Sequence, residues 1–220
     1  MILKKYNNIY SKQIKNTNIP LNIITKIFLS RFSPIKKNFK NKKLLDFSCG
    51  AGPYLNFFLN LGFKVYATEI SNEIVNLLKK KHKKIQFSIA RNNCINLPNK
   101  FFDFFISIHS IYYSENGNDT FDDTIKLLKS KIKKNGFFIF TIPKIEQKHL
   151  EFKHIKKNLY RINKDKYNLR KNSYFFLFKN KTEIRRYFEK FFKVIEIGSI
   201  YSDFKNLEEN YYLCVMQKKN

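Results

Sequence analysis

The stretch LLDFSCGAGPYLNFF, residues 44–58, constrains the fold of this chain more than any other part of its sequence. An apolar run ends at Asp46, a loop with two glycines follows, and Pro53 stands where the first turn of a helix is expected. Glycine lets a backbone turn sharply and approach a ligand closely, and the N–H groups of the next helix point at the same place. The chain has only six glycines, so the presence of Gly50 and Gly52 in one loop predicts a ligand-binding turn between a strand and a helix.

Strands and helices are predicted to alternate along the chain. Alternating apolar residues indicate the strands, and apolar residues at helical spacing indicate the helices. Gly62 is expected to be the C-cap of one helix and Ser71 the N-cap of the next. This order predicts an α/β fold, a doubly wound, Rossmann-like, mostly parallel seven-stranded sheet that ends in an antiparallel hairpin at its edge. The expected strands are 43–48, 64–70, 85–90, 102–110, 137–143, 193–200 and 211–219, with a further one at 174–180, and the expected helices are 54–62, 72–83, 119–136 and 181–192.

The composition bounds the possible partners and compartments. The net charge of +26 is consistent with a polyanionic partner, but only six of the 43 basic residues are Arg and the lysines are scattered, which favours codon bias over a phosphate-binding patch. No apolar run reaches the roughly 18 residues of a membrane span, and no secretory signal opens the chain. Three distant cysteines (Cys49, Cys94 and Cys214) form neither a disulfide framework nor a metal pair. We therefore expect a cytoplasmic protein without a metal site.

Acidic residues around the glycine loop indicate what kind of cofactor it holds. Glu69 closes the second predicted strand, 17 residues after Gly52, which is about the distance at which a carboxylate meets ribose hydroxyls. A dinucleotide loop would carry a third glycine where this chain has Leu55. Asp46 would also repel a pyrophosphate, so a cationic cofactor without phosphate suits the loop better. The alternative is a structural role for Asp46.

These motifs together resemble those of the class I S-adenosylmethionine-dependent methyltransferases. LLDFSCGAG is similar to their DxGxGxG motif, VYATEIS to their acidic end of strand two, and NNCINLPNKFFDFFIS to the region before strand four. The resemblance covers residues 40–143 by motif and 180–218 by architecture. It implies S-adenosylmethionine as the cofactor.

The resemblance also implies roles for individual residues. Asp46 would position the methionine end and Glu69 the ribose. Ile70, Asn93 and Cys94 would contact the adenine, and Ile108 or His109 would flank the sulfonium side. Two positions depart from the family pattern. Ser48 stands at the first glycine of the loop, and Asn93 replaces the Asp that accepts from the adenine amino group. The implied cofactor-binding set is Asp46, Ser48, Gly50, Gly52, Glu69, Ile70, Asn93, Cys94 and Ile108.

Catalysis of methyl transfer can rest on positioning alone, because the donor is already activated. If a general base takes part, His109 is the candidate, since it follows the fourth strand, with Tyr112 and Tyr113 beside it. The alternative is that all three residues are structural. The chain has no (D/N)PP(Y/F) motif after this strand, and no Pro-Cys nucleophile, so the sequence supports neither adenine-amine nor covalent pyrimidine methylation.

We expect one methyltransferase domain over residues 1–220. Residues 1–43 would form a helical lid, 44–143 the cofactor-binding core, 144–180 a basic, aromatic-rich substrate-side insertion, and 181–220 a closing helix and hairpin. The expected reaction moves a methyl group to oxygen or nitrogen of a small metabolite. If this metabolite is anionic, the basic insertion would help to bind it. The alternatives are an RNA methyltransferase and a non-catalytic cofactor-binding or scaffold protein. The sequence leaves the oligomeric state open.

Overall fold

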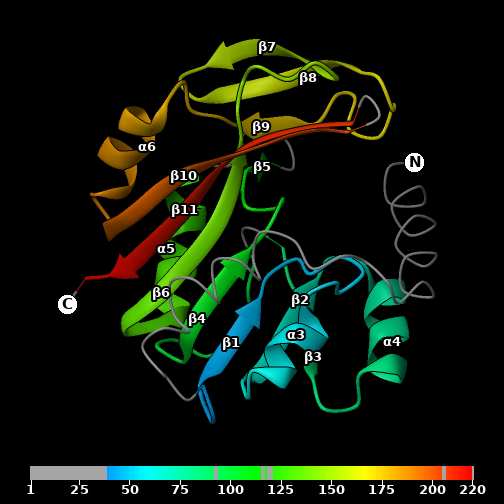
Figure 1. Cartoon of the computed structure of the whole chain (residues 1–220), viewed down its shortest axis with the longest axis vertical. Coiled ribbons are helices and arrows are strands. Elements are labelled where there is room, and N and C mark those ends of the chain that lie inside the picture. Colours follow the sequence, from blue (N-terminus) through cyan, green and yellow to red (C-terminus); the bar gives the residue numbers. More distant parts are fainter. Residues whose placement is uncertain (1–38, 92–93, 115–116, 118–120, 205–206, 220) are drawn as a thin grey trace.

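The computed structural model of this chain describes residues 39–91, 94–114, 117, 121–204 and 207–219 (Figure 1). Most of the predicted N-terminal lid, residues 1–38, therefore lies outside the described residues, and Asn93 does too. Within the described ranges, no helix has both the length and the apolar character needed to cross a membrane.

The main sheet has seven strands in the order β10-β11-β6-β4-β1-β2-β3, which confirms the predicted fold class. Strands β3, β2, β1, β4 and β6 run parallel in that spatial order, while β11 is antiparallel to both β6 and β10. The predicted hairpin at the edge is thus the β10–β11 pair. The strands are β1 (Lys43–Asp46), β2 (Lys64–Glu69), β3 (Gln86–Ile89), β4 (Phe102–Ser107), β6 (Ile132–Pro143), β10 (Phe192–Phe204) and β11 (Leu207–Lys218).

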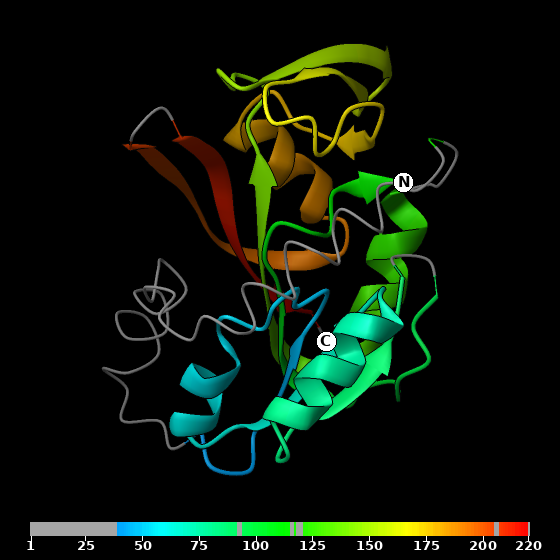
Figure 2. The ribbon, with the colours of Figure 1, turned by 90° about the vertical axis from the view of Figure 1, so that its right-hand side faces the viewer.

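Helices cover both faces of this sheet, as a doubly wound fold requires (Figures 1 and 2). Successive strand residues alternate between the two faces, so Leu44 packs with helices α3 (Leu55–Asn60) and α4 (Asn72–Lys81), whereas Leu45 packs with α5 (Phe121–Lys131) and α6 (Lys181–Phe188). Both leucines are fully buried. The sheet therefore divides two apolar cores.

The predicted helix caps next to the glycine loop are confirmed. Gly62 has a φ of +90°, and its N–H donates to Leu59 O at 2.9 Å while Phe63 N–H donates to Phe58 O at 3.2 Å. This is the hydrogen-bond pattern of a Schellman motif. The Ser71 hydroxyl accepts from Ile74 N–H at 3.3 Å and caps α4. These caps fix where β2 begins and where the chain leaves it.

The helix predicted over 119–136 is wrong at its C-terminal end, because α5 stops at Lys131. The Lys131 ammonium is buried and donates to Leu97 O at 2.8 Å and to Asn99 Oδ1 at 2.9 Å. Strand β6 then begins at once, with Ile132 paired to Phe102. The next four residues bulge out before pairing resumes at Phe137, so the polar run KKNG belongs to a strand irregularity and not to a helix.

A second, antiparallel sheet has the order β5-β9-β8-β7. It consists of β5 (Tyr113–Ser114), β7 (Leu150–Lys156), β8 (Leu159–Asp165) and β9 (Tyr174–Phe176). The strand predicted at 174–180 is present only as β9, and the sequence missed β5, β7 and β8. In Figure 1 this sheet lies beyond the arrowheads of β1 and β4, so it stands over the carboxyl edge of the main sheet.

The hairpin β10–β11 is longer than predicted. The expected strands leave residues 201–210 between them, but most of these residues extend the two strands, with Tyr201 paired to Asn210 and Ser202 to Glu209. The extension reaches the level of the second sheet (Figure 1). There Lys144 N–H donates to Asn210 O at 2.9 Å, and the Asn210 side chain donates to Glu146 O at 3.0 Å. These bonds attach the hairpin to the segment that enters the insertion.

Candidate cofactor and acceptor site

The glycine loop is held by backbone hydrogen bonds to the neighbouring strands. Phe47 N–H donates to Ile106 O at 2.9 Å, and Cys49 N–H donates to Thr68 O at 2.8 Å. Ser48, Gly50 and Gly52 all have a left-handed backbone, with φ of 57°, 56° and 71°. Ser48 therefore keeps the conformation that glycine would take there, at a cost of about 1–2 kcal/mol.

Glu69 lies at the end of β2 and fastens this loop. Its side chain is fully buried, and its Oε2 accepts from Gly50 N–H at 3.0 Å while its Oε1 accepts from Ile70 N–H at 2.7 Å. Glu69 thus has a structural role in this loop, and it lies at the carboxyl edge of the parallel strands, where ligands bind in open α/β sheets.

Asp46 ends the neighbouring strand β1 and is an unusual buried acid. It is 2 % exposed, and its Oδ2 has no hydrogen-bond partner among the described residues. Burial, with a smaller contribution from the charge of Glu69, raises the pKa of Asp46 to about 7. A buried carboxylate without a counter-charge is costly, and a cationic ligand group at this place would remove that cost.

The other predicted cofactor residues are more exposed. Ile70 and Ile108 are half-buried, and Ile108 packs against the core that contains Leu44. Cys94 is exposed and forms an isolated bridge with Arg91. Ile70 directly follows β2 and Ile108 directly follows β4, so both lie at the carboxyl edge of the parallel strands, where ligands bind in open α/β sheets.

His109 follows β4 at the same edge. Its backbone is left-handed, with a φ of 58°, and its N–H donates to Thr141 Oγ1 at 2.8 Å. Its ring meets that of Tyr211 edge-on, with 4.4 Å between the centroids. Burial, followed by the charge of Arg170, lowers the pKa of His109 to about 4, so its imidazole is neutral at physiological pH.

The two predicted tyrosines lie in different environments. Tyr112 is 1 % exposed, stacks on Tyr113 at 5.1 Å, and contacts Phe175 at 4.8 Å, so it is part of the core. Tyr113 is only partly buried and forms the first residue of β5. The Arg170 side chain hydrogen-bonds Tyr113, and burial raises the pKa of the Tyr113 hydroxyl.

Sequence reasoning missed two residues that the fold brings to this place, Tyr211 of β11 and Arg170 of the loop between β8 and β9. Arg170 acts electrostatically on Tyr112, Tyr113 and Tyr211 as well as on His109. The one available signal was the rarity of arginine in a lysine-rich chain, since Arg170 is one of six.

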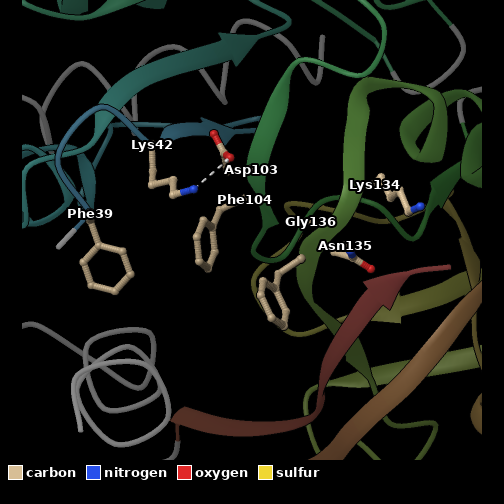
Figure 3. A pocket seen from close by; sticks show the side chains of 8 residues that line it. Phe39, Lys42, Asp103, Phe104, Lys134, Asn135 and Gly136 are labelled. Atoms are coloured by element: carbon tan, nitrogen blue, oxygen red, sulfur yellow. Dashed lines mark ion pairs between the residues drawn. The ribbon is translucent and has the colours of Figure 1, made fainter. Parts of the chain in front are cut away.

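A cavity of about 420 Å³ lies at the other end of the sheet (Figure 3). Phe39, Phe104 and Phe137 line its apolar part, and Lys42 forms an ion pair with Asp103 at 3.6 Å at its rim. Lys42 directly precedes β1 and Asp103 lies near the start of β4, so this cavity faces the amino ends of the parallel strands. It is therefore separate from the glycine loop and His109.

Comparisons with known proteins agree with this geometry. The family model described as a methyltransferase domain matches residues 24–196. An uncharacterized protein of Haemophilus influenzae is 32% identical over 113 residues, which is 47% of this chain and 43% of that protein, so the match spans less than half of its length.

Two solved structures show the same fold. An S-adenosylmethionine-dependent methyltransferase from Clostridium acetobutylicum superposes with a TM-score of 0.62 at 16% identity, covering 99% of both chains. The 1,6-didemethyltoxoflavin-N1-methyltransferase of Burkholderia thailandensis, solved with its acceptor and S-adenosylhomocysteine bound, gives 0.58 at 12% identity, over 92% of this chain and 93% of its own. The chain belongs to the methyltransferase-domain family.

Proposed function

We propose that this protein transfers the methyl group of S-adenosylmethionine to an oxygen or nitrogen atom of a small metabolite. The observation that carries the proposal is the convergence of His109, Tyr113, Tyr211 and Arg170 beyond the carboxyl edge of the parallel strands. These residues come from three separate parts of the chain. They are few and close together, which suits a small acceptor better than an extended one.

The residues around the glycine loop fit the cofactor in two ways. The unpartnered Oδ2 of Asp46 suits the ammonium of the methionine moiety, and the Glu69 carboxylate, at the end of β2 beside Gly50, suits the ribose hydroxyls. When bound, the cofactor supplies an activated methyl group on a sulfonium. Ile108 provides an apolar side chain at the edge that would face it.

His109 is proposed to orient the acceptor. A neutral imidazole can accept a hydrogen bond from an N–H or O–H nucleophile, but a group with a pKa of about 4 holds a proton only weakly. We therefore assign His109 to alignment of the acceptor and leave the released proton to solvent. Positioning of this kind can supply much of the acceleration of an in-line displacement.

Transfer of labelled methyl from S-adenosylmethionine into a cell extract tests the proposal. We expect label in a low-mass fraction that survives RNase treatment. The Asp46→Asn variant should lose this transfer because the cofactor's cation loses its counter-charge. Label that disappears with RNase would favour an RNA methyltransferase instead. Cofactor binding without transfer to any fraction would favour a non-catalytic cofactor-binding protein.

A further inference from the structure

The turn after β4 holds His109 in a backbone conformation that the surrounding structure must support. Its φ of 58° lies in the left-handed region, which is unfavourable for a residue with a side chain. Such conformations persist where neighbouring contacts fix them, and they gather at functional sites. Here the contacts come from both strands that flank β4, since the turn is bonded to the end of β1 on one side and to β6 on the other.

On the side of β1, two serines hold the turn. Ser110 Oγ donates to Phe47 O at 3.2 Å, which uses the one proton of its hydroxyl. Ser107 Oγ lies 2.6 Å from Ser110 Oγ, so Ser107 is the donor of that bond. Both serines are buried. Phe47 directly follows β1 and leads into the glycine loop, so the turn that carries His109 is attached to the cofactor side of the site.

On the side of β6, Thr141 contacts both the backbone and the ring of His109. Thr141 Oγ1 accepts from the His109 N–H at 2.8 Å and lies 3.5 Å from His109 Nδ1. The Thr141 side chain is fully buried, and its backbone pairs with Leu213 of β11. Threonine is also stiff about its Cα–Cβ bond, because it is branched at Cβ. The Thr141 hydroxyl is therefore a fixed point to which His109 is bound twice.

The second ring nitrogen of His109, Nε2, has no hydrogen-bond partner among the residues that the structure describes. The ring is half-buried and meets the ring of Tyr211 edge-on, with 4.4 Å between the centroids. Tyr211 in turn pairs with Pro143 at the end of β6. Whichever of Oγ1 and Nδ1 carries the proton between them, the fold occupies Nδ1 and leaves Nε2 for a ligand.

We propose that Thr141 is a positioning residue for methyl transfer, whose hydroxyl holds the His109 ring so that Nε2 meets the acceptor. The inference rests on the proposed function, because it explains how His109 is held for the alignment assigned to it. A ring that is already oriented loses little conformational freedom when the acceptor binds. The role requires only the hydroxyl, so serine should replace Thr141 and the isosteric valine should not.

Nitrogen-15 NMR of the full-length protein, labelled at histidine, tests the orientation of the ring. The chain has four histidines, and the spectrum of His109→Gln identifies the signals of His109. At neutral pH we expect one tautomer of His109 in the wild type and in Thr141→Ser. In Thr141→Val we expect a mixture of both tautomers, with ring-proton shifts closer to those of free histidine because the contact with Tyr211 is loosened.

Thr124→Val is the matched control for these spectra. It makes the same change at a buried threonine of α5, which covers the sheet face that contains Leu45, and it should leave the His109 signals unchanged.

Transfer of labelled methyl to the low-mass fraction of a cell extract tests the effect on the reaction. Thr141→Val should slow transfer by about 10- to 100-fold, because misplacing a reacting group by about 1 Å can cost about 100-fold. Thr141→Ser should slow it far less. If Thr141 acts through His109, Thr141→Val should cause no further loss in protein that already carries His109→Gln. S-adenosylhomocysteine affinity should be equal in all these variants.

Unchanged His109 signals in Thr141→Val, transfer as fast as in the wild type, or a further loss in the double variant would each overturn the role of Thr141. Absence of transfer by the wild type contradicts the proposed function instead, and the His109 spectra still decide whether Thr141 holds the ring. If Thr141→Val unfolds or loses S-adenosylhomocysteine, Thr141→Ala makes the same test, since it removes the hydroxyl without placing a methyl group against the ring.

Discussion

Among single residues, Asp46 has the environment that most strongly affects both stability and ligand binding. Its pKa is raised from 3.8 to about 7 by its burial and, to a smaller extent, by the charge of Glu69. The folded apoprotein therefore binds this proton more tightly than the unfolded chain does, and its stability falls as the pH rises through the window from 3.8 to about 7.

Replacing Asp46 with Asn should remove this loss of stability. Above pH 7 the apo variant should be more stable than the wild type, by at most about 4 kcal/mol, and the difference should vanish below pH 4. Urea unfolding of both proteins at pH 8, 6 and 3.5 measures this difference in the free energy of unfolding. All other ionisable groups are the same in the two proteins, so their contributions cancel from the difference. A variant that is less stable at every pH would show that Asp46 has a partner in the folded protein.

Cofactor affinity should be sensitive to the loss of the negative charge of Glu69. In Glu69→Gln one oxygen becomes an NH₂ group that cannot accept from Gly50 or Ile70, so the loop loses a hydrogen bond and the ribose site loses its charge. Cofactor affinity should fall by about 1–3 kcal/mol, as for other charged hydrogen bonds. Calorimetric titration with S-adenosylhomocysteine checks this, with the exposed Glu73→Gln of α4 as control. Equal affinities in both variants would place the ribose elsewhere.

On the scale of secondary-structure elements, the turn from β1 into α3 depends on Gly52. A Cβ at this position would lie 2.4 Å from Leu55 Cδ1, and the φ of +71° is itself unfavourable for alanine. We expect Gly52→Ala to cost about 1–2 kcal/mol of stability for the backbone alone, and to weaken cofactor binding because the helix start must shift.

Gly198→Ala offers a matched comparison in β10. Its backbone is not left-handed, and the nearest atom to a Cβ there would be Leu213 O at 3.9 Å. Thermal unfolding and cofactor titration of the two variants should therefore differ clearly. A Gly52→Ala protein as stable as Gly198→Ala would mean that the loop has an alternative conformation of similar energy.

For the whole molecule, the net charge of +26 predicts non-specific binding to RNA that depends steeply on salt. Affinity for a random single-stranded RNA should fall by about tenfold or more between 50 and 200 mM salt, because each neutralised phosphate releases counterions. Fluorescence anisotropy measures this, and S-adenosylhomocysteine affinity over the same range should change little. RNA binding that persists at 200 mM salt and depends on sequence would favour the RNA methyltransferase alternative.

The sequence by itself determined the parts of the protein that rest on local patterns. The glycine loop, the acidic ends of β1 and β2, and the caps at Gly62 and Ser71 could be predicted because each depends on residues a few positions apart. The alternation of strands and helices then led to the sheet, since parallel strands with short connections have few ways to assemble. This is why the cofactor side of the site could be proposed from residue order alone.

The tertiary structure decided the features that depend on contacts between distant segments. The end of α5 is set by Lys131 reaching Leu97 and Asn99, more than 30 residues away. The strand β5 joins the second sheet through the pairing of Tyr113 with Phe175, which lies more than 60 positions later in the chain. Arg170 stands in a basic segment whose local pattern does not distinguish it from the lysines around it. Its place beside Tyr211 and His109 arises when β4, β11 and the insertion meet, and no local sequence signal encodes such a meeting.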